Sequence, residues 1–525
     1  MKKIASLLLV VMLLCSTTAF AAELMPGTYT GSAVTVGGPI EVKVTVDEDS
    51  ILSIEVTEIH DSEGVYNTAA KRIPQQIIEN QSLNVDTVSG ATLSSLFIKN
   101  AVKDALSKAG DIEAFNEAAA WSAPAQADME ADVVVVGGGI AGMSAAATAA
   151  SGGLKVILVE KNGFVGGNAV ISDQFCLTGV TEPVVSGWKP LIQDLNDMGI
   201  PAGLTEYPGY GADTLLTMPD SAHSPMFQLI DNMRAVIESH DGIVLTDTPA
   251  IGLISDNNTV TGVIAHPEGQ ESFEIHSKGV ILATGGFSSN KELVTEYLPY
   301  AAEARSAGLG SNRGDALQWI GAIDVKTVYM DADVSSFYAF SPSLGYYAEF
   351  AFLPIHFIDL EGNLITEDTQ YNTGAMKTFL SVGKEQFYTV VSADDIANAG
   401  SQEAYDHMVL AGTADRFESI QSLAEKCELP KLVDTMASLG LEDGAYYACR
   451  ASAEIYGTYG GIAVDLEGHA LGNDDKTVPG LYACGEVTGS RDFQETGAYA
   501  GGLGPALTTG HIAGLTAIKE LSSLE

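Results

Sequence analysis

The stretch that most restricts the fold is residues 131–161, ADVVVVGGGIAGMSAAATAASGGLKVILVEK. An apolar run ends at a GxGxxG pattern made by Gly137, Gly139 and Gly142, and an alanine-rich segment of helical character follows. Glycines at these positions allow a tight turn and let a pyrophosphate approach the N-terminus of a helix. A second apolar run ends at Glu160, 18 residues after Gly142, where a carboxylate can bind a ribose hydroxyl. This stretch therefore predicts a β-α-β dinucleotide-binding unit.

The C-terminal part predicts a return to the same sheet. GGIAVDLEG and VPGLYACGEVTG have strand-and-loop character, and PALTTGHIAGLTAIKELSSL closes the chain as a helix. Between the β-α-β unit and this C-terminal part, residues from about 287 to 455 lack a glycine-rich phosphate loop and hold more aromatic residues. The predicted fold class is α/β, a Rossmann-like domain with an inserted α+β domain.

A separate small α+β domain is predicted over residues 24–110. Residues 39–59 alternate apolar and polar side chains around an acidic turn, which is typical of a β-hairpin. Two amphipathic helices are expected over 69–81 and 96–110, separated by the loop DTVSGATLSS. Residues 111–130, rich in alanine and acidic residues, read as a linker to the larger domain.

The N-terminus and the charge indicate an exported protein with no affinity for nucleic acid. Residues 1–21 have two lysines, an apolar run and a small-residue cleavage site, as in a secretory signal peptide. We therefore expect a periplasmic, extracellular or cell-surface location. The formal net charge is −42, and loss of Lys2 and Lys3 with the signal makes it −44, which repels nucleic acid. The chain has no CxxC metal pattern and no CxxCH haem pattern.

Several separated motifs resemble the fumarate reductase and succinate dehydrogenase flavoprotein family. They are EKNGFVGGN, GVILATGGFSSNKELV, GSNRGDAL and PGLYACGEVTG. The resemblance implies a non-covalent FAD in a domain built from residues 131–325 and 453–525, with a substrate cap over 326–452. It also implies FAD contacts from the side chains of Glu160, Asn168, Asp315 and Glu486, from Gly167, and from the backbone of Ala141, Ala250 and Leu503.

Residues 24–105, and DTVSGAT above all, resemble the FMN-binding domain of respiratory flavoproteins. In that family a flavin transferase links FMN through its phosphate to the last threonine of the motif, which is Thr92 here. Gly90 permits the turn, and a hydroxyl at a helix start places a phosphate near the helix N-terminus. The alternative is that Thr92 only caps the helix that follows.

The resemblance also implies a changed substrate site. Fumarate reductases hold a dicarboxylate with histidines and arginines, but this chain has Tyr456 and Gly457 at the histidine pair and Asn372 at the proton-donating arginine. The segment TEDTQY resembles the motif of 3-ketosteroid dehydrogenases, which implies that Tyr371 takes part in proton transfer.

Two further candidates for the substrate site are Tyr499 and Arg450. The second tyrosine of the ketosteroid dehydrogenases falls at Thr496 here, and Tyr499 lies three residues later. Arg450 could assist electrostatically, although exposed or paired arginines are commoner. Packing is the alternative for both tyrosines, because the chain has 19 of them.

The predicted function is an exported oxidoreductase with two flavins. Electrons would pass from an external redox donor to FMN and then to FAD, which would reduce an activated C=C bond of a small enone or enoate. One alternative is the reverse reaction, a dehydrogenase that desaturates a ketone. Another is an electron carrier without catalysis.

Overall fold

The computed structural model describes fifteen segments of the chain. They are residues 24–35, 38–59, 63–116, 126–172, 184–207, 211–220, 223–306, 308–331, 333–336, 353–366, 387–410, 412–441, 443–451, 454–489 and 502–522. The predicted signal peptide, Tyr371, Asn372 and Tyr499 lie outside these segments.

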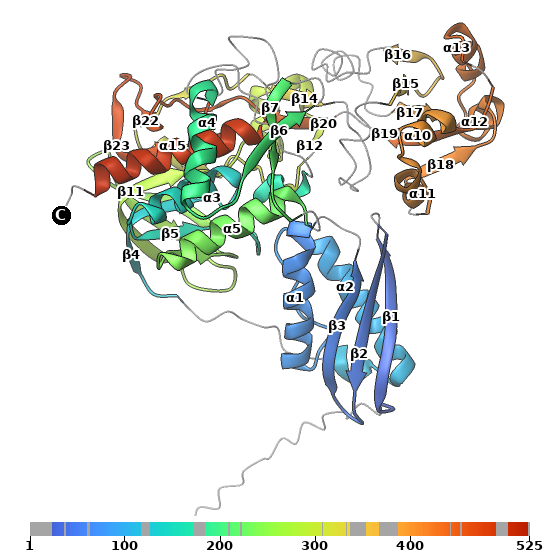
Figure 1. Cartoon of the computed structure of the whole chain (residues 1–525), viewed down its shortest axis with the longest axis horizontal. Coiled ribbons are helices and arrows are strands. Elements are labelled where there is room, and N and C mark those ends of the chain that lie inside the picture. Colours follow the sequence, from blue (N-terminus) through green and yellow to red (C-terminus); the bar gives the residue numbers. More distant parts are fainter. Residues whose placement is uncertain are drawn as a thin grey trace, which may run out of the picture.

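The N-terminal domain is a three-stranded antiparallel sheet covered on one face by two helices (Figure 1). The hairpin expected from the alternating pattern is confirmed as β2 and β3, and both predicted helices are present. The strands and helices are β1 (Gly27–Thr35), β2 (Gly38–Val46), β3 (Ile51–Ile59), α1 (Glu63–Asn80) and α2 (Thr92–Ala109).

Strand β1 was not predicted, and Gly31 explains how it fits. A Cβ atom at Gly31 would lie 2.1 Å from the Ala101 carbonyl oxygen and 2.8 Å from Ala105 Cβ. Because only glycine has no Cβ, β1 can lie directly against helix α2. The sheet therefore gains a third strand whose sequence, GTYTGSAVT, shows little apolar alternation.

The predicted linker is shorter than residues 111–130. A 3-10 turn, η1 (Glu113–Asn116), belongs to the N-terminal domain, because Phe115 is buried and its carbonyl accepts a hydrogen bond from the Leu83 N–H at 2.7 Å. At the other end, β4 begins at Met129. Both ends of the stretch therefore form part of the neighbouring domains.

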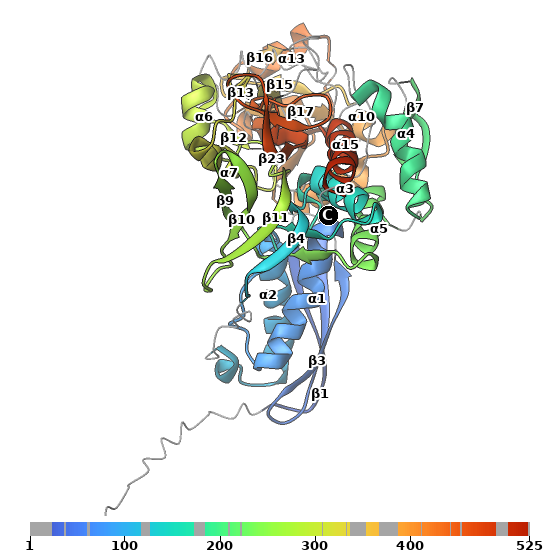
Figure 2. The same cartoon turned by 90° about the vertical axis from the view of Figure 1, so that its left-hand side faces the viewer.

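The larger domain is built on a mainly parallel sheet with strand order β22-β23-β11-β4-β5-β8, extended by β10 and β9 beside β11. Figures 1 and 2 show the N-terminal domain, in blue, below this sheet and its helices. The strands are β4 (Met129–Val136), β5 (Val156–Val159), β8 (Ile243–Leu245), β9 (Ala250–Asp256), β10 (Thr259–Ala265), β11 (Phe273–Leu282), β22 (His469–Leu471) and β23 (Thr477–Ala483).

Alternate residues of the central strands enter two hydrophobic cores. Val133 and Val135 of β4 pack with the helices on one face, whereas Val134 and Val136 pack with β9, β10 and the short helix α7 (Asp315–Trp319) on the other. A parallel strand covered on both faces needs such a continuous apolar run. The helices of the first face are α3 (Ile140–Ser151), α4 (Val184–Asp197), α5 (Pro225–Ser239) and α15 (Leu503–Leu521).

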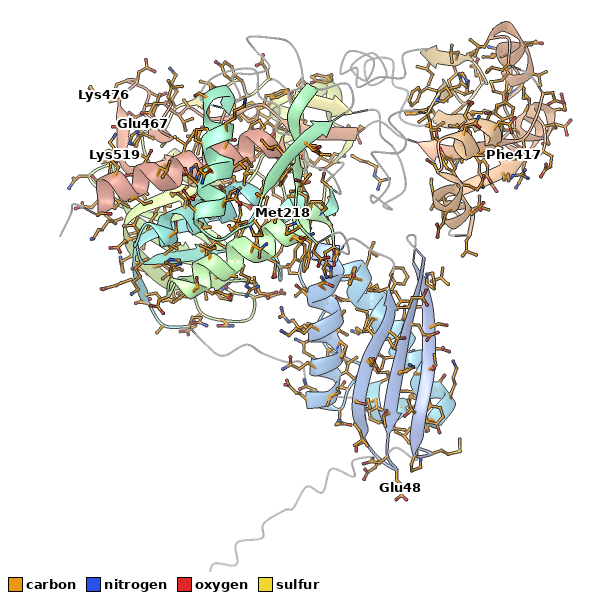
Figure 3. All side chains as sticks on the ribbon, viewed as in Figure 1. Glu48, Met218, Phe417, Glu467, Lys476 and Lys519 are labelled. Atoms are coloured by element: carbon orange, nitrogen blue, oxygen red, sulfur yellow. The ribbon has the colours of Figure 1, made fainter. Side chains whose placement is uncertain are left out.

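Helices α3 and α15 run parallel and in close contact. A Cβ atom at Gly510 would lie 2.1 Å from the Ala141 carbonyl oxygen, and one at Gly514 would lie 2.7 Å from the Ala145 carbonyl oxygen. Near its end, α15 is tied to the turn before β22, where Lys519 Nζ lies 2.8 Å from Glu467 Oε1 (Figure 3). The C-terminal helix is therefore an integral part of the domain.

The inserted region starts later than residue 326. Strand β13 pairs with β21, and β14 pairs with β20, so residues 327–336 belong to sheets completed by the C-terminal part of the chain. The elements involved are β12 (Arg305–Ser306), β13 (Thr327–Val328), β14 (Asp333–Ser336), β20 (Glu454–Thr458) and β21 (Gly461–Ile462).

A separate lobe, which we call the cap lobe, comprises the elements between β14 and β20 and is coloured orange in Figure 1. Its antiparallel sheet has the order β16-β15-β17-β19-β18. Its elements are β15 (His356–Ile358), β16 (Leu364–Thr366), β17 (Phe387–Ser392), α10 (Ala393–Asn398), α11 (Gln402–Leu410), β18 (Ala414–Phe417), α12 (Ile420–Lys426), α13 (Leu432–Ser438) and β19 (Tyr446–Ala451).

Shorter elements complete the larger domain. They are η2 (Gly167–Ile171), the hairpin of β6 (Gly203–Tyr207) and β7 (Gly211–Thr217), α6 (Lys291–Tyr297), η3 (Pro299–Ala301), α7 (Asp315–Trp319), η4 (Ile320–Ala322) and η6 (Gly485–Val487). None of the described helices combines the length and the apolar character that crossing a bilayer requires.

Candidate functional site

The predicted glycine loop has the geometry of a dinucleotide-binding turn. Gly137 has a φ of +105°, and a Cβ atom there would lie 2.3 Å from the Ala283 carbonyl oxygen. A Cβ atom at Gly142 would lie 1.9 Å from the Gly137 carbonyl oxygen, so α3 packs directly on the turn. A Cβ atom at Gly139, the residue before α3, would meet nothing within 4 Å. The space in front of the helix N-terminus is therefore open, as a pyrophosphate requires.

Glu160 closes the loop from the end of β5. It is buried, and its two carboxylate oxygens accept hydrogen bonds from the Gly138 N–H at 2.6 Å and the Asn162 N–H at 2.7 Å. Burial raises the pKa of the Glu160 carboxyl, and the two backbone N–H groups oppose this rise. The predicted ribose-binding acid is thus held in a fixed orientation beside the glycine loop.

The segment after Glu160 returns to the glycine loop. The Gly166 N–H donates to the Gly138 carbonyl at 2.6 Å, and Gly167 has a φ of +53°. Asn168 follows, and its Oδ1 accepts a hydrogen bond from the Leu309 N–H at 3.0 Å. Gly167 and Asn168 therefore lie beside the glycine loop, and their contacts with FAD remain predictions.

Asp315 is joined to the same segment through Lys161. Lys161 Nζ lies 2.5 Å from Asp315 Oδ2 and donates to the Ser311 carbonyl at 2.5 Å. Both side chains are about a quarter exposed, with 26% for Lys161 and 24% for Asp315. Asp315 is therefore paired with the residue that follows Glu160, and its contact with FAD remains a prediction.

Glu486 lies in η6, the short turn that follows β23. Its carboxylate accepts hydrogen bonds from the Thr458 N–H at 2.9 Å and from Asn312 Nδ2 at 2.7 Å. Burial raises the pKa of the Glu486 carboxyl, and these donors oppose the rise. Glu486 thus ties the C-terminal segment to residues before and after the inserted region.

The three residues whose backbone is predicted to contact FAD lie at or near the start of a helix or strand. Ala141 lies in the first turn of α3, and a Cβ atom at Gly485 would approach its Cβ to 2.7 Å. Leu503 is the first residue of α15, and Ala250 is the first residue of β9. Their contacts with FAD remain predictions.

Thr92 is exposed and is the first residue of α2, an 18-residue helix. The residue before the helix is Ala91, so the helix start has no side-chain cap. Buried Ser95 fixes the loop instead, because its Oγ accepts from the Val88 N–H at 3.0 Å and donates to the Ala91 carbonyl at 2.8 Å. The Thr92 hydroxyl is therefore not needed as the helix cap, which was the alternative role.

Arg450 belongs to the cap lobe and is engaged with a tyrosine. Its side chain is exposed, its Nε donates to Tyr388 Oη at 3.3 Å, and its guanidinium lies 5.8 Å from the centre of the Tyr388 ring. Burial raises the pKa of Tyr388, and Arg450 opposes that rise. No described contact joins Arg450 to the dinucleotide site. Tyr371 and Tyr499 lie outside the described residues.

The sequence did not reveal how the two domains meet. Arg72 Nη1 on α1 lies 2.6 Å from Asp247 Oδ2, which follows β8, and these residues are 175 positions apart. Glu63 on α1 pairs with His223 and accepts from the Ser224 N–H at 2.9 Å. His223, which precedes α5, thus contacts the N-terminal domain. No local pattern signals contacts at such separations.

The residues present fit FAD in the larger domain. The open space at Gly139, the helix behind it and the buried Glu160 supply the three features that a pyrophosphate and a ribose require. Among the residues that the structure describes, no group of three or more His, Cys, Asp or Glu side chains could hold a metal ion. Cys427, Cys449 and Cys484 are free thiols.

Two curated relatives cover most of this chain. One is the NADH:acrylate oxidoreductase of Vibrio harveyi, 26% identical over 88% of this chain and 58% of the relative. The other is the urocanate reductase of Eggerthella lenta, 27% identical over 91% of this chain and 90% of the relative. The chain thus spans little more than half of the first relative and nearly all of the second.

Solved structures share the fold of the larger domain. An open conformation of a flavocytochrome c3 fumarate reductase has a TM-score of 0.64 at 22% identity and covers 76% of this chain and 79% of its own. The 3-ketosteroid Δ1-dehydrogenase of Sterolibacterium denitrificans has a TM-score of 0.59 at 18% identity, with coverages of 74% and 99%. The shared fold agrees with the resemblances of the sequence to fumarate reductases and to 3-ketosteroid dehydrogenases.

Family models match both parts of the chain. A model for an FMN-binding domain matches residues 36–107. A model for an FAD binding domain matches residues 132–176 and 199–501, which is more than half of the chain. The chain therefore belongs to the FAD binding domain family and carries an FMN-binding domain at its N-terminus.

Proposed function

We propose that this protein is an exported oxidoreductase that reduces an activated C=C bond of a small enone or enoate. The single observation that carries the proposal is the presence, in one chain, of a glycine loop held by Glu160 and an FMN-binding domain with an exposed Thr92. The named activities of the acrylate and urocanate relatives support the same reaction class. Export is inferred from the signal-like residues 1–21.

The two flavins would carry the redox chemistry, with electrons passing from FMN on Thr92 to FAD and then as hydride to the substrate. The protein's own residues have other tasks. Glu160 and the glycine loop would orient the dinucleotide, and Tyr371 would deliver the proton to the substrate carbon next to the one that is reduced. A phenol can do so when a neighbour stabilises its anion.

The substrate we propose is neutral or carries one negative charge. The family's dicarboxylate clamp is replaced by Tyr456, Gly457 and Asn372, none of which carries a positive charge. A second carboxylate would therefore lose its counter-ions on binding, which is costly in a site shielded from water. Acrylates, aromatic acrylates and enones meet this requirement better than fumarate does.

Anaerobic reoxidation tests the proposal directly. Protein with both flavins is reduced with a small excess of dithionite and mixed with a panel of enones and acrylates, with fumarate as the dicarboxylate comparison. We expect flavin absorbance to return with at least one neutral or mono-anionic compound, and more slowly with fumarate. Reoxidation by none of the compounds, together with desaturation of a ketone by the oxidised protein, would support the dehydrogenase alternative.

A further inference from the structure

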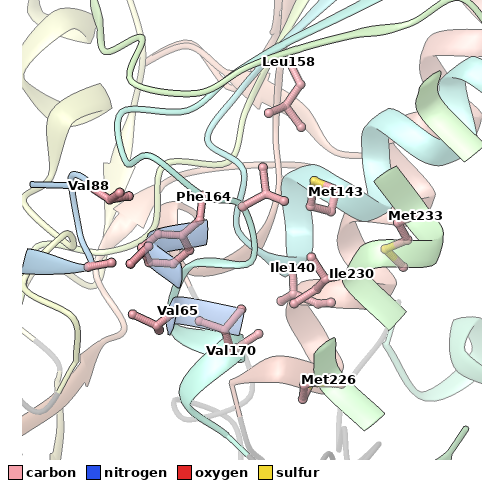
Figure 4. Close-up of a cluster of buried hydrophobic side chains, with 14 of the residues drawn as sticks. Val65, Val88, Ile140, Met143, Leu158, Phe164, Val170, Met226, Ile230 and Met233 are labelled. Carbon is pink, nitrogen blue, oxygen red and sulfur yellow. The ribbon is translucent and has the colours of Figure 1, made fainter. Parts of the chain in front are cut away.

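The FMN-binding domain touches the FAD-binding domain through two sets of residues. The first, which we call the motif contact, joins Val88–Gly90 of the attachment loop to Asn162–Phe164. The second, which we call the helix contact, joins α1 to η2 and to residues before α5 and after β8. Figure 4 shows Val65, Val88, Phe164 and Val170 in one buried cluster at this boundary.

The motif contact is a close approach of two backbones. The Gly163 N–H donates to the Ser89 carbonyl at 2.8 Å, and Val88 and Phe164 are both buried. A Cβ atom at Gly163 would lie 2.5 Å from Val88 Cγ1, and one at Gly90 would lie 2.8 Å from Phe164 Cε1. Since neither position has room for a side chain, a glycine on each domain permits this approach.

The helix contact adds charged groups around the motif contact. Arg72 Nη1 lies 2.6 Å from Asp247 Oδ2, and the Asp247 N–H donates to the Asn162 carbonyl at 2.9 Å. Asp247 has a φ of +51°, a conformation that few non-glycine residues adopt. Arg72 therefore acts, through Asp247, on the same Asn162–Gly163 segment that the attachment loop touches.

The start of α1 provides a second anchor. Glu63 pairs with His223 and accepts from the Ser224 N–H at 2.9 Å. At the next residue, a Cβ atom at Gly64 would lie 2.5 Å from Val170 Cγ1. The two charged anchors lie nine positions apart on α1, which prevents the domain from pivoting about a single point.

We propose that Arg72 and Glu63 are positioning residues that hold the FMN-binding domain in one fixed pose on the FAD-binding domain. In this pose, Thr92 is two residues from Gly90, and Glu160 is two residues before Asn162, with each step spanning about 3.8 Å. The attachment loop thus meets the segment that carries the ribose-binding acid. The consequence for electron transfer rests on the proposed function, because it requires FMN on Thr92.

The proposal has a balanced redox consequence. Reduced FMN would be oxidised by giving two electrons to FAD, which would be reduced, while the protons exchange with solvent. No other reactant enters this step. Fixing the domain would raise the rate of the transfer, because no search between the domains would precede it.

Charge reversal tests the pose. Arg72→Asp places a carboxylate beside Asp247. The double variant Arg72→Asp/Asp247→Arg restores an ion pair with the opposite orientation. As the control, Lys71→Asp makes the same charge change at an exposed neighbouring residue. Hydrogen–deuterium exchange of the Gly163 amide in the full chain reports on its bond to Ser89. We expect exchange on the order of tenfold faster in Arg72→Asp, because like charges in a contact are strongly unfavourable. Slow exchange should return in the double variant, and Lys71→Asp should resemble the wild type.

The rate of FMN-to-FAD electron transfer, measured by stopped flow, should follow the same order among the variants, while direct reduction of FAD by dithionite stays unchanged. Unchanged Gly163 exchange in Arg72→Asp would overturn the proposed pose. Faster exchange with an unchanged interflavin rate would overturn the positioning role. If Thr92 carries no FMN, the proposed function fails in its two-flavin form, but the exchange measurement still decides the pose.

Discussion

Thr92 is the residue at which the chemistry of the N-terminal domain is expected to begin. It is exposed at the start of α2, and Ser95 rather than Thr92 fixes the loop. Thr92→Ala should therefore fold normally but lack the mass increment of one FMN less water that the wild type gains in a host with a flavin transferase. Extractable FAD should stay the same. The matched control is Thr30→Ala, an exposed threonine of β1, which should keep the increment. An unmodified wild-type protein in such a host would contradict the attachment.

Tyr371 is the residue expected to move a proton. Tyr371→Phe keeps the ring and removes only the hydroxyl, so the affinity for substrate and FAD should change little. General acid catalysis contributes about 10²–10⁴-fold, and the turnover number should fall by that range. The loss should occur in the reoxidation of FAD by substrate and not in its reduction. Tyr499→Phe serves as the comparison, and a loss confined to Tyr499→Phe would reassign the role.

The contact of α3 with α15 belongs to the scale of helices and strands. Gly510→Ala would place a methyl group 2.1 Å from the Ala141 carbonyl oxygen, at the start of the helix that faces the pyrophosphate position. Overpacking of this kind costs about 1–3 kcal/mol. We expect an unfolding temperature lower by a few degrees and less bound FAD per chain. Gly321→Ala, which introduces a methyl group into open space, is the control. Wild-type stability and FAD content in Gly510→Ala would show that the helices can separate without loss.

The contact of α1 with the loop before α5 should depend on pH. The hydrogen bond to Glu63 and its charge raise the pKa of His223, and Asp220 adds to this rise, while burial opposes it. The Phe227 ring also lies beside the imidazole, with 5.8 Å between ring centres. Because the folded pKa is raised, the contribution of this contact is complete below the ordinary value of 6.5 and is lost as pH rises through the raised value.

Exchange of the Ser224 amide, corrected for its intrinsic pH dependence, measures this effect. Protection should decrease with rising pH in the wild type, and His223→Gln should remove the dependence. His240→Gln, at the other end of α5, should leave it in place. A pH-dependent protection that persists in His223→Gln would assign the titration to another group.

The sequence predicted the elements whose patterns are local. GxGxxG and Glu160 form one β-α-β unit, and the alternating residues 39–59 form one hairpin, so short stretches contain the whole signal. Strand β1 was missed because its sequence shows little alternation of apolar and polar residues. Its place in the sheet depends on the close approach of Gly31 to α2, which the local sequence does not reveal. The boundary at 326 was misplaced because β13 and β14 are completed by strands more than a hundred residues later. The pair of Arg72 and Asp247 leaves no local signal for the same reason.

At the scale of the whole molecule, the excess of acidic residues should govern which donors reach the protein quickly. The chain has 68 acidic and 26 basic residues. A field of this sign raises the local concentration of cations and can change association rates by about 10–10³-fold. We expect a dicationic one-electron mediator to reduce the flavins at least about tenfold faster than an anionic mediator of similar potential at low ionic strength.

At about 1 M salt, where the screening length is about 3 Å, the two rates should converge. A neutral mediator is the control, and its rate should not change with salt. Equal rates for the two charged mediators at low salt would mean that the acidic residues lie away from the point of electron entry.

The cap lobe is inserted between β14 and β20, whereas the FMN-binding domain contacts the loops after β5 and β8. This arrangement has a kinetic consequence. A large reductant and the molecule to be hydrogenated would not compete for one opening. Under the proposed function, each half-reaction would then run without displacing the product of the other. Steady-state data should give parallel double-reciprocal lines, as in a two-site ping-pong scheme, and excess acceptor should not slow the turnover of a protein donor.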